Sequence, residues 1–215
     1  MRIFLQKNVQ SSSCTVKLAF VKWQMRSNLV IGDKQIFAID FRIFKPMDDF
    51  FIGEGYFLVY IDGFEYGIKK SDATVFGSIE WDLKTELMNH INDENLELGD
   101  FSSQNICNVY YDKHYREIND FSIDDYEAIS IALQNSPNSI LEWSPETAFD
   151  DGSHVIQFNK KNEICLMGFK TYGYEKIKDI HAVCISKEYY ENVLNAFFSE
   201  LDKFRIKHGL IKPAK

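Results

Sequence analysis

The chain has 215 residues, of which 45% are hydrophobic and 15% are aromatic, with only 4 Pro and 11 Gly. This composition excludes a disordered or fibrous chain, and no apolar run approaches the roughly 20 residues that are needed to span a bilayer. The net charge of −8 argues against general nucleic-acid binding, which needs positive charge to displace counterions.

The N-terminal part of the chain predicts antiparallel strands. Apolar and polar side chains alternate over residues 14–23, and residues 35–44 form a stronger strand with one continuously apolar face. Residues 56–68 predict a hairpin, because Asp62 and Gly63 can supply the positive backbone angles of a two-residue type I′ turn.

The middle of the chain predicts two helices. Ser71 and Asp72 fit the N-terminus of the first helix, and apolar side chains follow at four-residue steps as far as Ile91. The second helix is predicted at residues 121–134, with Ser122 at its N-cap. The segments around the second helix are predicted as an acidic loop at 92–104, a short strand at 106–111 and an irregular stretch at 135–152.

The C-terminal third predicts two further strand regions and a long helix. A hairpin is expected at residues 154–169 and a strand at 176–186, after which Ser186 caps a helix that Gly209 ends. Together these elements predict an α+β fold. It would consist of a mostly antiparallel sheet with hairpins, packed by two or three helices that include the long C-terminal helix.

The cysteines and the N-terminus bear on the compartment. Cys14, Cys107, Cys165 and Cys184 form no CxxC pair and match no zinc spacing, so we predict free thiols. The first 20 residues contain neither a continuous apolar core nor a small-residue cleavage site of a signal peptide. We therefore expect a cytoplasmic protein with reduced thiols.

No motif of nucleotide, metal or hydrolase chemistry occurs in the chain. The patterns GxxxxGK[ST], GxGxxG, HExxH and GxSxG are all missing, as is a DxDxDG calcium loop. The sequence thus predicts no catalytic residue, no metal and no cofactor. Two other interpretations stay open: a small enzyme that uses a carboxylate pair or a Cys/His pair across strands, and a structural module that associates with itself through a strand edge.

The negative charge is concentrated in the middle of the chain. Residues 46–158 carry 23 acidic and five basic side chains, an excess of 18 negative charges, whereas residues 1–45 carry +6 and residues 159–215 carry +4. This segment is either a solvated surface or a docking face for a basic partner, since a field of one sign speeds association with its complement.

Three segments carry a family resemblance. LVIGDKQIFAIDFRI (29–43), GYFLVYIDGFEYGI (55–68) and SDATVFGSIEWDL (71–83) resemble the immunity protein 42 family of bacterial polymorphic toxin systems. The closing unit KIKDIHAVCISKEYYENVLNAFFSEL (176–201) is similar to the C-terminal portion of that family. The resemblance implies a cytoplasmic, non-enzymatic protein that binds a cognate toxin domain and neutralises it by stoichiometric occlusion. Most matching residues are explained by the fold, and Asp40 in its apolar strand is the exception.

The resemblance also predicts the domain organisation. Residues 29–209 would form a single α+β domain, with residues 210–215 as a tail. Residues 1–28 would be an N-terminal extension, either an extra strand or the product of a misassigned start.

The acidic segment supplies the candidate contact residues. Many toxin domains in such systems are nucleases with basic clefts, so an acidic face could take the place of nucleic acid. The candidates are acids of the −18 segment, with two tryptophans as aromatic anchors: Asp48, Asp49, Glu54, Trp81, Glu94, Glu97, Asp100, Asp124, Asp125, Trp143, Asp150 and Asp151.

Overall fold

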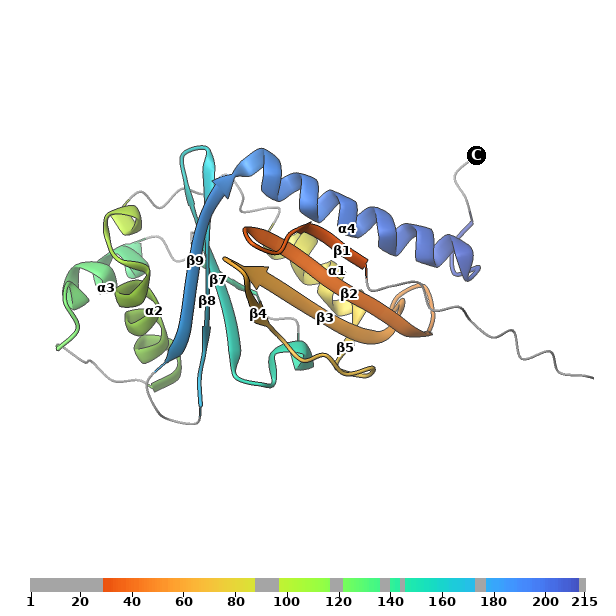
Figure 1. The fold of residues 1–215 in the computed structure, drawn as a ribbon, viewed down its shortest axis with the longest axis horizontal. Coiled ribbons are helices and arrows are strands. Elements are labelled where there is room, and N and C mark those ends of the chain that lie inside the picture. The colour runs from red at the N-terminus through yellow and green to blue at the C-terminus, as the bar shows by residue number, and fades with distance from the viewer. Residues whose placement is uncertain are drawn as a thin grey trace, which may run out of the picture.

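In the residues that the structure describes, the fold combines two antiparallel sheets with four α-helices, which confirms the predicted α+β class (Figure 1). The computed structural model describes residues 29–87, 97–116, 122–135, 140–143, 146–172 and 177–212. The strand predicted at residues 14–23 lies outside these ranges, and so does Glu94.

The first sheet contains the predicted hairpin. Its strands are β1 (Leu29–Asp33), β2 (Phe37–Pro46), β3 (Gly53–Ile61) and β4 (Phe64–Tyr66) in this order, and β5 (Thr74–Val75) pairs with β3. Asp62 and Gly63 connect β3 to β4 with φ angles of 50° and 79°. Both angles are positive, as the Asp-Gly turn predicted.

The second sheet is formed by the second half of the chain. Its strands are β6 (Ile140–Trp143), β7 (Ser153–Lys160), β8 (Glu163–Lys170) and β9 (Lys178–Ser186), in chain order. The predicted hairpin at 154–169 is therefore confirmed, and the strand predicted at 176–186 is confirmed over Lys178–Ser186. Residue 176 lies outside the described residues. The sequence does not predict strand β6, because its segment contains Pro and Gly residues that indicate an irregular stretch.

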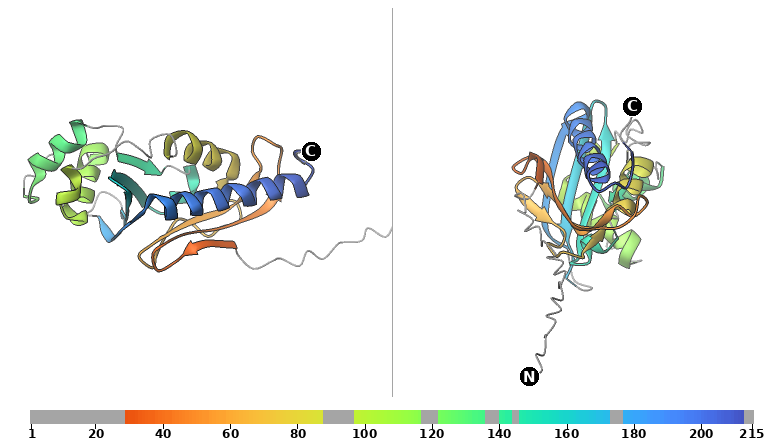
Figure 2. Two further views of the ribbon diagram at one scale, coloured as in Figure 1. Left: turned by 90° about the horizontal axis from the view of Figure 1, so that it is seen from above. Right: turned by 90° about the vertical axis from the view of Figure 1, so that its right-hand side faces the viewer.

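Helix α4 (Lys187–Lys207) follows β9 directly. The Ser186 side chain accepts a hydrogen bond from the Tyr189 backbone N–H at 3.2 Å, which confirms the predicted N-cap. After the helix, Gly209 takes a φ of 71°, the left-handed conformation that ends many helices. Figures 1 and 2 show α4 running along the first sheet.

The other helices differ from the prediction. Helix α1 (Phe76–Asp82) begins later than expected, because β5 occupies residues that the cap at Ser71 and Asp72 had assigned to the helix. The predicted strand at 106–111 is wrong, since these residues lie in α2 (Ser103–Tyr111). Helix α3 (Tyr126–Asn135) is confirmed, but it begins four residues after Ser122.

Two hydrophobic cores lie on opposite faces of the second sheet. Ile164 and Leu166 of β8 join a core with the first sheet, α1 and α4, whereas Cys165 and Met167 join a core with α2 and α3. Neighbouring side chains of a strand point to opposite faces. Strand β8 is therefore apolar on both sides and central to the molecule.

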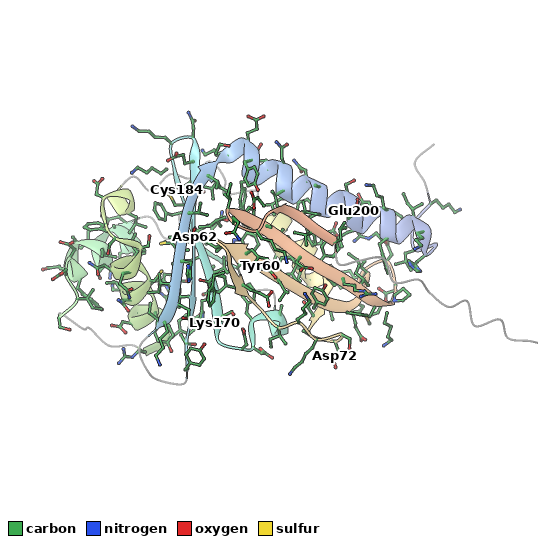
Figure 3. All side chains as sticks on the ribbon, viewed as in Figure 1. Tyr60, Asp62, Asp72, Lys170, Cys184 and Glu200 are labelled. Atoms are coloured by element: carbon green, nitrogen blue, oxygen red, sulfur yellow. A yellow bond between two sulfur atoms is a disulfide. The ribbon has the colours of Figure 1, made fainter. Side chains whose placement is uncertain are left out.

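The cysteine prediction was wrong for two residues. Cys165 of β8 and Cys184 of β9 face each other in the ladder and form a disulfide, with their Cα atoms 4.0 Å apart. Figure 3 marks Cys184 on β9. The pairing depends on strand register, which sequence spacing does not reveal. Cys107 is free and buried, as predicted, and burial raises the pKa of its thiol.

Candidate functional site

Exposed aromatic side chains lie in the loop between β2 and β3 and on the neighbouring helix α1. Phe50 in this loop is 73% exposed and Trp81 on the neighbouring α1 is 66% exposed, while Phe51 is 40% exposed. The rings of Phe50 and Phe51 contact each other edge to face, with their centroids 4.9 Å apart. We call Phe50, Phe51 and Trp81 the aromatic tip, because the β2–β3 loop that carries the two phenylalanines lies at the opposite end of the molecule from α2 and α3 (Figure 2).

The loop that carries the two phenylalanines is held from within. The Asp48 carboxylate accepts a hydrogen bond from the Phe51 N–H at 2.7 Å, and the Ile52 N–H donates to the Asp48 carbonyl at 2.8 Å. Ile52 is fully buried and has a φ of 63°, a conformation that β-branched residues rarely adopt. Its side chain anchors the loop in the core, while Phe50 and Phe51 face solvent.

Gly77 joins this loop to α1. The Gly77 N–H donates to the Phe51 carbonyl at 3.0 Å, and a Cβ atom on Gly77 would lie 2.0 Å from the Phe50 carbonyl oxygen. Only glycine permits so close an approach of two backbones. Trp81 lies one helical turn after Gly77 and therefore on the same side of α1 as the loop.

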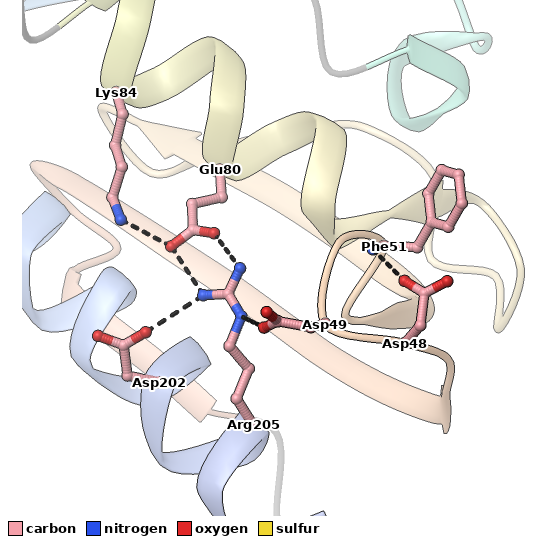
Figure 4. Close-up of polar contacts among 7 residues, drawn as sticks. All are labelled: Asp48, Asp49, Phe51, Glu80, Lys84, Asp202 and Arg205. Carbon is pink, nitrogen blue, oxygen red and sulfur yellow. Dashed lines mark hydrogen bonds and ion pairs between the residues drawn. The ribbon is translucent and has the colours of Figure 1, made fainter. Parts of the chain in front are cut away.

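Arg205 of α4 connects the same elements through ion pairs (Figure 4). Its guanidinium forms a bidentate pair with Glu80 of α1, reaches Asp202 at 3.2 Å, and lies 3.4 Å from Asp49 in the loop. Lys84 contacts Glu80 at 2.8 Å. Burial alone would raise the pKa of Glu80, but its hydrogen bonds from Arg205 and Lys84 lower it, so this carboxylate stays charged.

The predicted acids do not form one face. Asp48, Asp49 and Trp81 surround the loop, and Glu54 on β3 forms an exposed ion pair with Lys45 at 3.1 Å. The other described candidates lie elsewhere: Glu97 and Asp100 in a 3₁₀ turn before α2, Asp124 and Asp125 before α3, and Asp150 and Asp151 before β7. Figure 1 places α2 and α3 at the opposite end of the molecule from the β2–β3 loop.

Two candidates have internal roles. Trp143 is wrong as an aromatic anchor, because it is only 2% exposed and its ring packs against Phe37 and Phe57 in the core. Its Nε1–H donates to Gln157 at 3.1 Å, which satisfies the buried indole. Asp151 forms an ion pair with Lys170 at 2.8 Å that ties the turn before β7 to β8.

Sequence reasoning missed Phe50 and Phe51. The available signal was two consecutive phenylalanines directly after Asp48 and Asp49, in the segment that links two strands. Large apolar residues in such a turn have no strand face to bury them, so exposure could have been inferred.

A row of polar groups elsewhere resembles a hydrolase triad. The His154 Nδ1 atom lies 2.8 Å from Glu142, and the Thr171 hydroxyl lies 3.4 Å from the His154 Nε2 atom. The second oxygen of Glu142 accepts hydrogen bonds from Tyr110 at 3.0 Å and from Tyr115 at 2.6 Å. With both carboxylate oxygens engaged, we interpret the Glu142 cluster (Glu142, His154, Tyr110 and Tyr115) as a link between the helical layer and the second sheet.

Asp40 is also explained by internal contacts. Its buried carboxylate lies on the face of the first sheet away from α4, 3.1 Å from the Lys34 ammonium and 3.6 Å from the Lys69 ammonium. The Tyr56 hydroxyl donates to its other oxygen at 3.1 Å. These partners supply the charge and hydrogen bonds that a buried carboxylate requires, so the polar exception in β2 has a structural role.

No group of three or more His, Cys, Asp or Glu side chains in the described part of the chain could hold a metal ion. A cavity of about 210 Å³ lies between β8, β9 and the start of α2, and the disulfide and Lys160 line it. The Lys160 ammonium in this lining already donates a hydrogen bond to the Gly99 carbonyl. None of the described helices is long and apolar enough to cross a membrane.

Comparisons with known proteins identify the family. The model of the family described as immunity protein 42 matches residues 25–200. Among solved structures, the chain is similar to CdiI from Burkholderia dolosa AUO158, with a TM-score of 0.50 and 14% identity over 80% of this chain and 99% of that chain. That likeness shows the fold alone, and no curated protein matches the chain. Because the family model spans most of the sequence, the chain belongs to the immunity protein 42 family and is a toxin-neutralising immunity protein.

Proposed function

We propose that this protein neutralises its cognate toxin by stoichiometric occlusion, without chemistry of its own. Membership in an immunity protein family is the observation that carries the proposal. The contacts of the polar side chains support it. Cys165 and Cys184 are joined to each other, and the Glu142 cluster uses its hydrogen-bonding groups internally. The protein would act in the cytoplasm, where an incoming toxin meets its target.

We further propose that the toxin is a nuclease with a basic cleft. The excess of 18 negative charges over residues 46–158 supports this partner, because complementary charge accelerates encounter and suppresses wrong partners. The acids lie at more than one end of the molecule, so they would steer the approach of the toxin from a distance, and only some of them would touch it.

The stoichiometry can be tested with the toxin domain encoded beside the gene for this chain. Increasing amounts of the immunity protein should reduce the toxin's nuclease activity linearly to zero, with the end point at one protein per toxin. The two proteins should also co-purify as a complex. Loss of toxin activity at far lower ratios, with the toxin chemically altered, would instead show that the protein acts as an enzyme.

A further inference from the structure

We infer that the aromatic tip is the centre of the toxin-binding surface, and that it enters an apolar pocket bordered by Lys or Arg side chains on the toxin. This inference rests on the proposed function and adds to it the location of the contact and the chemistry of the partner surface. It depends on the exposure, the support and the charge of the tip.

The exposure of the tip is the first argument. Phe50 and Trp81 are the two most exposed of the large hydrophobic side chains that the structure describes, and they flank the same loop–helix junction. A soluble protein gains nothing from displaying such groups together, so exposed apolar patches often mark interaction sites. Aromatic side chains are also enriched among the residues that contribute most to binding.

The support beneath the tip is the second argument. Ile52 anchors the loop in the core, Gly77 fixes it against α1, and the Arg205 ion pairs connect both to α4. The aromatic side chains are therefore held in place before binding, and less conformational freedom is lost when the partner arrives. The unusual φ of Ile52 costs folding free energy, and such strain is often found at binding loops.

The charge around the tip indicates the kind of partner. Arg205 pairs with Asp49, Glu80 and Asp202, and Lys84 pairs with Glu80, while Asp48 accepts the Phe51 backbone N–H. These four carboxylates and two cations leave an excess of two negative charges. A second copy of this chain would bring the same carboxylates opposite each other, because both surfaces of a two-fold dimer are identical. A cationic rim on the toxin is complementary instead.

The area of the tip also disfavours self-association. A stable interface buries about 800 Å² on each partner, whereas a fully buried aromatic side chain contributes about 150–250 Å². Three aromatic side chains that are already partly packed fall short of that area. The tip is therefore better suited to be the anchor of a larger, complementary surface on the toxin.

The test measures binding to the toxin domain encoded beside the gene, inactivated by mutation, for the wild type and for tip variants. Phe50→Ser and Trp81→Ala should each raise the Kd by about 30-fold or more, mainly through faster dissociation. Ile131→Ser and Tyr172→Ser are matched controls, because these side chains are also exposed but lie away from the tip. The controls should leave the Kd within about threefold of the wild type.

A second pair of substitutions tests the cationic rim. Asp48→Asn retains an oxygen for the Phe51 N–H, and Asp49→Asn retains most of the side-chain volume. The double variant should slow association severalfold and make the association rate less dependent on salt, because it removes two negative charges and leaves the Glu80–Arg205 pair beneath the loop in place. An association rate and salt dependence equal to those of the wild type would overturn the inference that the toxin has a cationic rim.

The outcomes separate the two proposals. If the wild type does not bind the toxin domain, the proposed function fails. If the wild type binds and the tip variants bind equally well, only the tip assignment fails. Sedimentation of the isolated protein provides a further check. A dimer that Phe50→Ser disrupts while toxin affinity is unchanged would show that the tip contacts a second copy, which would also overturn the inference.

Discussion

At the scale of single residues, the acidic side chains of this protein have unequal roles. Asp40 and Glu142 have internal partners at both carboxylate oxygens, whereas Asp48 and Asp49 are exposed beside the aromatic tip and each has one polar side-chain contact within the protein. Composition counts all of them equally. The contacts divide them into acids that stabilise the fold and acids that remain available to a partner, and the two groups should respond differently to substitution.

Asp40 should be important for stability. Asp40→Ala leaves the Tyr56 hydroxyl and two ammonium groups without their shared partner, and we expect it to reduce the free energy of unfolding by about 2 kcal/mol. Lys69→Ala removes one half-exposed member of the group and should cost less than about 1 kcal/mol. Urea unfolding of both variants measures the difference, and equal losses would contradict the structural role given to Asp40.

Glu142 should make stability depend on pH. Burial alone would raise the pKa of this carboxyl, but hydrogen bonds from His154, Tyr115 and Tyr110 lower it below the value in the unfolded chain. The stabilisation is therefore complete above the pKa of the unfolded state and is lost as the pH falls through the pKa of the folded state. Glu142→Gln should reduce stability at neutral pH and flatten its decline in acid, as measured by thermal unfolding across a pH series.

At the scale of elements, features set by neighbouring residues are predicted correctly from the sequence, whereas features that depend on distant contacts are not. The Asp62-Gly63 turn and the Ser186 cap follow from neighbouring residues, and both are present. Residues 106–111 have the composition of a strand, yet they form part of α2, because Ile106, Cys107 and Tyr110 then pack on the second sheet. The preference of a short segment thus gave way to tertiary packing, which a single sequence does not display.

The capping of α4 can be tested directly. Ser186→Ala removes the acceptor for the Tyr189 N–H and should lower the free energy of unfolding by about 1 kcal/mol. Ser186→Asp keeps an acceptor at the same place and adds a charge that favours the helix N-terminus, so its stability should stay close to that of the wild type. Chemical denaturation compares the two variants. A similar loss in both would show that packing, and not the cap, determines the effect at this position.

The candidate site was also only partly predictable. Charge pointed to Asp48 and Asp49, and the expectation of an aromatic anchor pointed to Trp81, all of which lie beside the same loop. The exposure of Phe50 depends on Ile52 taking the buried position of the loop, and the register of β2 and β3 decides this. The prediction that Trp143 is an exposed anchor was wrong, because the sequence does not show which tryptophan the core encloses.

At the scale of the whole molecule, one core joins both sheets. Phe37 and Phe57 of the first sheet contact Trp143 of the second, and Phe197 of α4 packs in the same cluster. The second core is separate in its contacts, but it shares the strands of the second sheet. Residues 29–209 should therefore behave as a single folding unit, as proposed from the sequence.

This unity predicts a single unfolding transition. A variant with Trp23→Phe and Trp81→Phe retains Trp143 alone, so its fluorescence reports on the shared core. The midpoint seen by fluorescence should coincide with the midpoint seen by far-ultraviolet circular dichroism, as two-state unfolding requires. Two separated transitions, with the helical signal lost first, would show that α2 and α3 form an independent unit.

The construction of the β2–β3 loop has a consequence for molecular engineering. The residues that fix its backbone, Ile52 and Gly77, are distinct from Phe50 and Trp81, which the surface displays. Displayed positions can thus be randomised in a combinatorial library while the framework keeps its shape. If recognition resides there, new inhibitors could be selected from this scaffold by varying only a few codons, and the same separation would let a gene duplicate acquire a different target without first losing its fold.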